Sequence, residues 1–455
     1  MSQRNLAWML VVPALVLMGA VISATAPPPE KDYKLVRTVV DVMAEVDKNY
    51  VRELSDDEKK KLVEDMIQGG LGRLDPHSTY FNEDEYHQFT SDTEGKFGGI
   101  GAYLTLHPQL QILMIESPMV GTPAFRANLQ SGDLIYKIDD KSTENLRVDE
   151  ARVFIKGVAG TKVVLTVLRV GTQKLEEVPL VREDIKILAV RGFARDPASP
   201  EKWDYFADKE SKIALIRLSA FNEHTDAELK GALHEAEEAG AKALVLDMRN
   251  NPGGLLSQAI KVSDLFLSAG KIVSTKDRTG TGRKWEATKD NGAFESARER
   301  PMAVLVNTDS ASASEIVAAA LQDNGRAAIV GERTYGKGSV QKIFELSDHK
   351  TAVKLTAEVW LTPNGKNIHR WPASKATDEW GVRPDEGLDV KLTIEERRQH
   401  ILHVNRLDKL KPKGEAPKPG PDEPKLDPNY KDKPLEKALE HLRKKLVQAP
   451  ERKPS

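Results

Sequence analysis

The chain has 455 residues, of which 40% are hydrophobic and 30% charged, a composition typical of two or three folded domains rather than of disorder. Its 67 basic and 69 acidic residues leave a formal net charge of -2, which gives no overall electrostatic attraction for nucleic acid. Because the chain contains no cysteine, structural disulfides, zinc–thiolate sites and cysteine nucleophiles are excluded.

Residues 1–26 have the layout of a secretory signal. Arg4 precedes an apolar run from Leu6 to Ile22, and the small residues Ser23-Ala24-Thr25-Ala26 follow. A buried N-terminal helix is disfavoured because polar, proline-rich sequence comes next. We expect export to the periplasm or cell envelope. Cleavage of the segment and its retention as a membrane anchor both stay open, since the run approaches the roughly 20 residues that span a bilayer.

Residues 32–94 are expected to form a mainly helical region. Apolar residues recur at helical spacing in two stretches, one containing Leu35, Val39, Val42, Met43 and Val46 and the other Leu62, Met66, Ile67 and Leu71. Ser55 opens the second helix in a capping box with Glu58, three residues later. His77 follows in a compact turn, where we interpret it as a structural histidine rather than a catalytic base.

Residues 95–184 change to short strands, predicted at 112–115, 134–138 and 163–168, with a helix at 148–155. A glycine-rich segment, Gly98–Leu104, precedes them. This order resembles a PDZ domain. In such a domain the N–H groups of a glycine loop bind the terminal carboxylate of a peptide, which adds a strand to the sheet edge. The loop is expected to be Gly99-Ile100-Gly101-Ala102, with Ile100 and Leu104 lining the side-chain pocket.

Residues 185–398 alternate between buried-type strands and helices. Strands are predicted at 213–218, 243–247, 303–307 and 327–330, and helices at 226–239, 255–267 and 312–323. The alternation predicts an α/β core with parallel strand pairing. Residues 399–433 are read as a proline- and lysine-rich linker. Residues 434–447 form an amphipathic helix that either docks or self-associates, or stays a solvated tail. The helices at 35–70 and 434–447 are candidate surfaces for a homodimer.

Ser312 lies where a predicted strand delivers the chain to an alanine-rich helix. A serine at such a junction is close to free N–H donors and to the positive end of the helix dipole. Those are the requirements of an oxyanion hole. On this segment alone a helix N-cap is the more common role for a serine.

A second motif, Gly336-Lys337-Gly338, follows the next strand, so Lys337 can return to the start of the same helix. A lysine acts as a general base only when it is neutral, and burial among apolar neighbours lowers its pKa from about 10.4. The flanking glycines allow close approach. The chain lacks the G-x-x-x-x-G-K-[ST] phosphate loop, the Gly-x-Ser-x-Gly elbow and the His-Glu-x-x-His zinc motif. No residue pattern points to a histidine-based triad, a metal or a cofactor.

These motifs together resemble the carboxyl-terminal processing peptidases, also called tail-specific proteases, over about residues 35–390. The resemblance rests on segments 75–81, 97–101, 247–254, 310–315 and 336–341. It implies that Ser312 is the nucleophile, that Lys337 is the general base and that Gln341 orients the lysine. The N–H groups of Ala313 and of the Gly253-Gly254 turn would form the oxyanion hole. It also implies a crotonase-related core with an inserted PDZ domain that can cover or open the catalytic groove.

The predicted protein is therefore an exported serine endopeptidase that binds accessible C-terminal tails of protein or peptide substrates. It needs no cofactor or metal ion, and nucleic acid is not a partner. Two other classes of protein compete with this reading. One is an exported PDZ scaffold on an inactive peptidase core, which the intact Ser312, Lys337 and Gln341 disfavour. The other is an acyl-CoA enzyme on a crotonase-like core, in which a PDZ domain has no role.

Overall fold

The computed structural model describes residues 30–107, 109–196, 198–199, 201–288, 298–408, 410 and 426–448. Segment 1–26 lies outside these residues, and no helix among those described is long and apolar enough to cross a bilayer. The chain divides into two compact units, Met1–Leu74 and Asp75–Ser455.

The first unit contains two helices, α2 (Glu30–Asn49) and α3 (Asp56–Leu71). The predicted capping box of α3 is confirmed. The Glu58 N–H donates to Ser55 Oγ at 3.3 Å, and the Ser55 N–H donates to Glu58 Oε2 at 2.9 Å. These bonds satisfy donors that the first turn of a helix otherwise leaves free.

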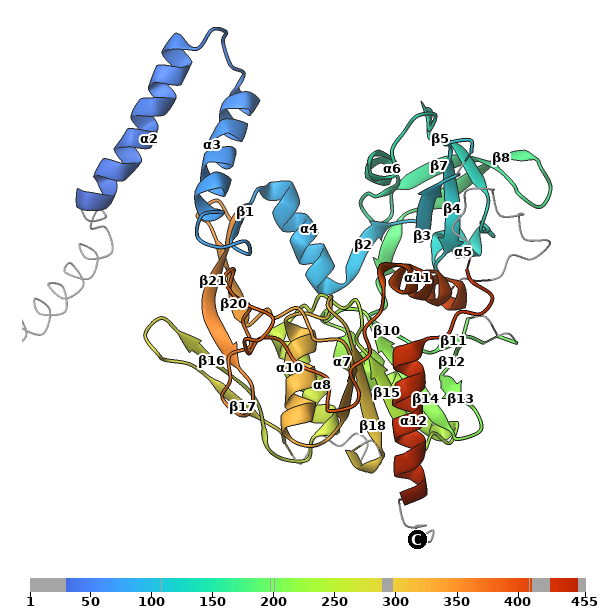
Figure 1. Ribbon diagram of the computed structural model, residues 1–455. Helices are drawn as coiled ribbons and strands as arrows, with labels where there is room; N and C mark the ends of the chain where they lie inside the picture. The colour runs from blue at the N-terminus through green and yellow to red at the C-terminus, as the bar shows by residue number, and fades with distance from the viewer. Residues whose placement is uncertain are drawn as a thin grey trace, which may run out of the picture. The chain divides into compact units, whose positions relative to one another are not determined.

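The second unit begins with short elements that lead into a β-sheet domain (Figure 1). They are β1 (Thr79–Phe81), α4 (Glu83–Glu94) and β2 (Lys96–Gly99), which pairs with β9 (Glu183–Lys186). The sheet has the order β3-β4-β5-β7-β8, so β3 forms one edge. Its strands are β3 (Ala102–Leu106), β4 (Leu113–Pro118), β5 (Leu134–Ile138), β6 (Lys141–Ser142), β7 (Lys162–Leu168) and β8 (Leu175–Val181). Helices α5 (Pro123–Arg126) and α6 (Val148–Ile155) complete it, α6 at the predicted position.

A second sheet, the core of an α/β layer, has the order β10-β14-β15-β18-β19. Strands β14 (Ile213–Leu218), β15 (Ala243–Asp247), β18 (Met302–Val306) and β19 (Ala328–Gly331) pair in parallel. The predicted parallel pairing is confirmed. Strands β10 (Val190–Arg191) and β13 (Phe206–Asp208) pair antiparallel with β14, and β11 (Ala194–Arg195) pairs with β12 (Trp203–Asp204) outside the sheet. Every residue of β15 and β18 is buried, as expected for parallel strands covered on both faces.

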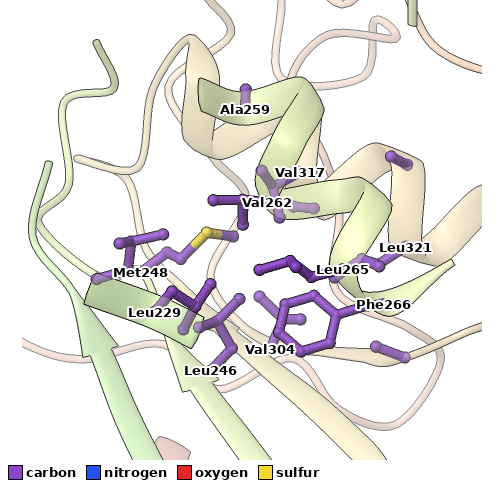
Figure 2. Close-up of a cluster of buried hydrophobic side chains, with 14 of the residues drawn as sticks. Leu229, Leu246, Met248, Ala259, Val262, Leu265, Phe266, Val304, Val317 and Leu321 are labelled. Atoms are coloured by element: carbon purple, nitrogen blue, oxygen red, sulfur yellow. The ribbon is translucent and has the colours of Figure 1, made fainter. Parts of the chain in front are cut away.

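One face of this sheet is covered by three helices, α7 (Thr225–Glu238), α8 (Leu256–Phe266) and α10 (Ala313–Asp323). Figure 2 shows side chains of these helices meeting those of the sheet in one apolar cluster that includes Leu229, Leu246, Val262, Val304 and Val317. The cluster holds the start of α10, and with it Ser312, against the ends of the parallel strands.

The opposite face is covered by α12 (Lys433–Gln448). Leu435, Ala438, Leu439 and Leu442 are buried in a cluster with Ile213, Val245, Leu305 and Val330 of the sheet. The apolar stripe of α12 is therefore docked within the chain, and the alternative of a solvated tail helix is wrong. A helix α11 (Ile394–Asp408) also occupies residues 399–408, the first part of the range read as a linker.

An antiparallel sheet lies beside the α/β layer, with the order β1-β21-β16-β17 and β20 also paired to β21. Its strands, besides β1, are β16 (Lys271–Asp277), β17 (Lys284–Glu286), β20 (Ser339–Glu345) and β21 (Ala352–Leu361). The loop before β20 carries Lys337. The long β20–β21 hairpin thus connects the lysine to the turn before β1, because Thr79 of β1 pairs with Lys354 of β21.

We predict that Leu442→Ala lowers the free energy of unfolding by about 2–4 kcal/mol, because the fully buried side chain of Leu442 leaves a cavity under the sheet. Val447→Ala, in the same helix at 86% exposure, is the matched control and should change it by less than about 0.5 kcal/mol. Urea unfolding followed by circular dichroism measures both. Equal stability of the two variants would show that α12 does not dock in solution.

Candidate active site

Ser312 occupies a strained position at the start of α10. Its φ is 54° and its ψ is -112°, a conformation that residues other than glycine rarely adopt. Gly253 packs directly against it, since a Cβ at Gly253 would lie 2.9 Å from Ser312 Cβ and 2.7 Å from the Ala311 carbonyl oxygen. Glycine at 253 is therefore needed for the turn before α8 to approach the serine.

The carboxylate of Glu315 connects the Ser312 segment with the Lys337 segment. Its Oε2 accepts from the Ser312 N–H and from the Lys337 N–H, both at 2.8 Å. Its Oε1 accepts from Thr334 Oγ1 at 2.5 Å and from the Gly336 N–H at 2.6 Å. The side chain is fully buried. One carboxylate with four donors thus sets the distance between the two backbones that carry the serine and the lysine.

Burial raises the pKa of Glu315, whereas the hydrogen bonds to its carboxylate lower it. A buried carboxylate with four donors is stabilised by charge-assisted bonds, and all four donors stay satisfied only while it is ionised. Sequence reasoning assigned no role to Glu315. The signal was present as a serine followed three residues later by a glutamate at a helix start, the spacing of a capping box.

Lys337 lies in the loop between β19 and β20. Its carbonyl accepts from Trp360 Nε1 at 2.9 Å, and the next N–H, of Gly338, donates to His369 Nδ1 at 3.2 Å. A Cβ at Gly338 would lie 2.7 Å from the His369 backbone nitrogen, so this neighbour must be glycine. Burial lowers the pKa of Lys337, and the charge of Lys354 lowers it further. The structure therefore favours the neutral amine more than water does.

A cavity of about 400 Å³ brings the predicted catalytic residues together. It is lined by Ser312, Ala313, Gly253, Gly254, Lys337 and Gln341. Apolar side chains complete the wall, among them Phe221, Leu256, Ile316, Val340 and Trp360. A hydroxyl and an amine of lowered pKa therefore face one partly apolar space, which is the arrangement that nucleophilic catalysis requires.

The two serines beside Ser312 are occupied elsewhere. Ser310 Oγ donates to the Met248 carbonyl at 2.8 Å, and Ser314 Oγ donates to the Asn251 carbonyl at 2.9 Å. Both serines are fully buried, whereas Ser312 is half-buried and lines the cavity. The geometry thus favours Ser312 as the nucleophile among the three.

The three predicted oxyanion-hole residues differ in their hydrogen bonding. The Gly253 N–H already donates to Asn251 Oδ1 at 2.9 Å. The Gly254 and Ala313 N–H groups donate to no acceptor in the part of the chain that the structure describes. Both residues line the cavity beside Ser312. Gly254 and Ala313 are therefore the pair with donors available for a developing oxyanion.

Gln341 lies in strand β20, and its Nε2 donates to Ser339 Oγ at 3.0 Å and to Thr356 Oγ1 at 3.1 Å. The Thr356 hydroxyl in turn donates to Asp75 Oδ1 at 3.1 Å. The same carboxylate accepts from the His77 N–H at 2.7 Å. The turn containing His77 is therefore hydrogen-bonded to the β20–β21 hairpin beside Lys337. The same hydrogen bonds fix the position of the Gln341 side chain.

In the β-sheet domain, the predicted loop residues lie at the start of the edge strand β3. Gly101 has a φ of 73°, and its carbonyl accepts from Thr122 Oγ1 at 2.9 Å. A Cβ at Gly101 would lie 2.4 Å from Thr122 Cβ, so the loop requires glycine there. Ile100 is buried in the domain core, and Leu104 packs at its margin. Gly99 ends β2 and Ala102 begins β3.

Comparisons with known proteins agree with this division of the chain. A model of peptidase family S41 matches residues 212–387, and a PDZ domain model matches residues 90–168. A carboxy-terminal-processing protease of Bartonella bacilliformis is 36% identical over 404 residues, which cover 85% of each chain. A carboxyl-terminal-processing protease of Synechocystis is 38% identical over 72% of this chain and 71% of its own. The solved photosystem II D1 C-terminal processing protease is 26% identical, with a TM-score of 0.42, over 76% of this chain and 85% of that one.

Among the described residues, no group of three or more histidine, aspartate and glutamate side chains is arranged to hold a metal ion.

We predict that Glu315→Gln lowers the turnover of a peptide substrate by about 100-fold, because an amide NH₂ replaces an acceptor and displaces the Ser312 or Lys337 backbone by a fraction of an ångström. Turnover of a fluorogenic peptide measures the change. Glu286→Gln, an exposed glutamate of β17, is the control for loss of charge and should retain the full rate. A folded Glu315→Gln protein with undiminished turnover would contradict the role assigned to this carboxylate.

Proposed function

Because the chain belongs to the carboxy-terminal-processing proteases of peptidase family S41 and carries a PDZ domain, we propose that it is a serine endopeptidase with a Ser–Lys dyad. Ser312 is the nucleophile and Lys337 the general base. One observation carries the proposal. Both side chains line the same cavity, and the backbone N–H groups of both residues donate to one oxygen, Oε2, of the Glu315 carboxylate.

The reaction begins when the neutral Lys337 amine accepts the proton of the Ser312 hydroxyl. Ser312 Oγ then attacks the carbonyl carbon of the substrate peptide, and the carbonyl oxygen becomes an oxyanion. The N–H groups of Gly254 and Ala313 stabilise that charge. When the intermediate collapses, the protonated Lys337 gives its proton to the leaving amine and an acyl ester remains on Ser312. Water, deprotonated by Lys337, hydrolyses the ester.

The lowered pKa of Lys337 determines how this base works near neutral pH. At an ordinary pKa of about 10.4, roughly one lysine in 2,500 is neutral at pH 7. Each unit of decrease raises the neutral fraction about tenfold, at a cost of about 1.36 kcal/mol in the free energy of the charged form. Burial is the main cause of the decrease here, and the positive charge of Lys354 is the second.

The PDZ domain supplies the substrate preference in this proposal. Among the strands that the structure describes, β3 pairs with β4 alone, which leaves its outer edge for an added strand, with α6 beside it. Gly99-Ile100-Gly101-Ala102, at the start of this strand, would receive the terminal carboxylate, and Leu104 would contact an apolar side chain of the tail. Export, which the layout of residues 1–26 indicates, would place the substrates among proteins of the cell envelope.

Removing either member of the dyad should abolish cleavage. We expect Ser312→Ala and Lys337→Met each to lower the turnover of an unstructured protein such as casein by at least about 1,000-fold, the order found when a unit of a catalytic dyad or triad is lost. Gel analysis of the products measures it. Either variant cleaving at the wild-type rate would overturn the proposed mechanism.

Recognition of tails should depend on the free terminal carboxylate. We expect a peptide substrate with a C-terminal amide to show a KM about tenfold higher than the free acid, a loss of about 1.4 kcal/mol, with kcat unchanged. Paired peptides of identical sequence provide the control. Identical KM values for acid and amide would show that the loop at 99–102 does not bind the terminus.

A further inference from the structure

The catalytic cavity contains a second lysine, Lys354, to which the proposed mechanism gives no role. Lys354 lies in strand β21, where it pairs with Thr79 of β1 on one side and with Ile343 of β20 on the other. It is therefore fixed in the middle of a three-strand segment, not on a loop. Its side chain reaches the same cavity as Lys337.

The Lys354 ammonium is held by aromatic rings rather than by a carboxylate. Its Nζ lies 5.1 Å from the centre of the Phe81 ring and 5.9 Å from that of Phe89. In the part of the chain that the structure describes, no carboxylate lies within 4.0 Å of it. Two other lysines of the same hairpin do have such partners: Lys342 pairs with Glu358, and Lys350 pairs with Glu83.

Other charged or titratable groups near the lysine pair do not neutralise Lys354. Glu315 is engaged by four donors around the Ser312 and Lys337 backbones. Asp75 accepts from the His77 and Ser78 N–H groups, from Ser78 Oγ and from Thr356 Oγ1. Burial lowers the pKa of His77 and of His369, which favours the neutral form of both imidazoles. Asp92, also on the cavity wall, accepts from Gln88 Nε2 at 2.6 Å.

Two ammonium groups that share a partly buried cavity repel each other, so the first proton to leave the pair leaves more easily than from an isolated lysine. Which lysine loses it depends on the surroundings of each. Phe81 and Phe89 stabilise a cation at Lys354, since the faces of aromatic rings attract positive charge. No such ring contact is found for Lys337 among the described residues. Burial lowers the pKa of Lys354 as well as that of Lys337. Because the ring contacts are at Lys354, they favour retention of the proton there and its loss from Lys337.

We propose that Lys354 is a positioning residue whose retained positive charge keeps Lys337 in the neutral, proton-accepting form. The inference rests on the proposed role of Lys337 as general base. It agrees with the charge of Lys354 being, after burial, the second cause that lowers the pKa of Lys337. The sign follows directly. Without the charge, the pKa of Lys337 rises, and a higher pH is needed to make it neutral.

The test is the pH dependence of kcat/KM of the full chain, measured with a fluorogenic peptide that carries no acidic side chain. Lys354→Met removes the charge and keeps an apolar stem of similar length, whereas Lys354→Arg keeps the charge. Lys350→Met, on the same hairpin and outside the cavity, is the matched control. We expect the acidic limb of the methionine variant to move by about one unit to higher pH, which is a loss of about tenfold on that limb. The arginine variant and the control should keep the wild-type limb.

An acidic limb that does not move in Lys354→Met overturns the inference, whether kcat/KM falls by one factor at every pH or does not fall at all. A uniform fall would mean a structural or substrate-binding role. If the methionine variant does not fold, Lys354→Gln provides the same comparison. A second readout follows Lys337 itself. In the full-length Ser312→Ala protein, acetylation of Lys337 by acetic anhydride can be followed by mass spectrometry across pH. The midpoint pH of this acetylation should rise by the same amount when Lys354→Met is added.

The general-base role of Lys337 and the supporting role of Lys354 can be disproved separately. Activity remaining in Lys337→Met would remove the general base, and the inference with it. If Lys337→Met is inactive but Lys354→Met has the acidic limb of the wild-type pH profile, the proposed Ser312–Lys337 dyad stands. Only the role of Lys354 is then disproved.

Discussion

A carboxylate that is removed from water needs hydrogen-bond donors for its charge, and the Glu315 carboxylate takes them from two segments that are distant in sequence. The Ser312 N–H comes from the strand-to-helix junction, and the Gly336 and Lys337 N–H groups come from the loop that leads into β20. Much of the active-site architecture depends on this interaction. It offsets part of the cost of the positive φ at Ser312, and it places the lysine backbone beside the serine without involving the lysine amine, which remains free to titrate.

The charged groups around the Lys337 amine are also engaged by other partners. The carboxylates whose charges act on the Lys337 amine, Glu315 and Asp75, are each surrounded by hydroxyl and backbone donors, and among the described residues neither forms an ion pair with a lysine. Had one of them bound Lys337 as an ion pair, the pKa of the lysine would rise and the base would be lost. The aromatic setting of Lys354 adds a positive charge to the cavity at a fixed place. In the proposed mechanism, a lysine base therefore depends on neighbouring carboxylates whose oxygens are already hydrogen-bonded to other donors.

Much of the fold could be predicted from local pattern. Strands β14 and β15 coincide with the mainly apolar segments at 213–218 and 243–247, because parallel strands covered on both faces have no polar face that would give an alternating pattern. Ser312 and Lys337 could be singled out because a strand-to-helix junction and a glycine-flanked lysine are local features. Glu315 could not be assigned a role, since its capping-box spacing fits a solvent-exposed cap as well as a buried clamp, and the difference lies in donors 19 to 22 residues away. The docking of α12 could not be predicted either, because the sheet face that it covers is formed by strands distant from it in sequence.

The central claim, that Ser312 is the nucleophile and that neutral Lys337 activates it, is tested most directly by covalent labelling with a fluorophosphonate across pH, with the labelled residue identified by peptide mass spectrometry. The account predicts a label on Ser312 alone, a labelling rate that rises with pH through one ionisation below the ordinary lysine pKa of about 10.4, and loss of that rise in Lys337→Met. A label on another serine, such as Ser310, Ser314 or Ser339, or the same pH-dependent rate without the lysine, would contradict it.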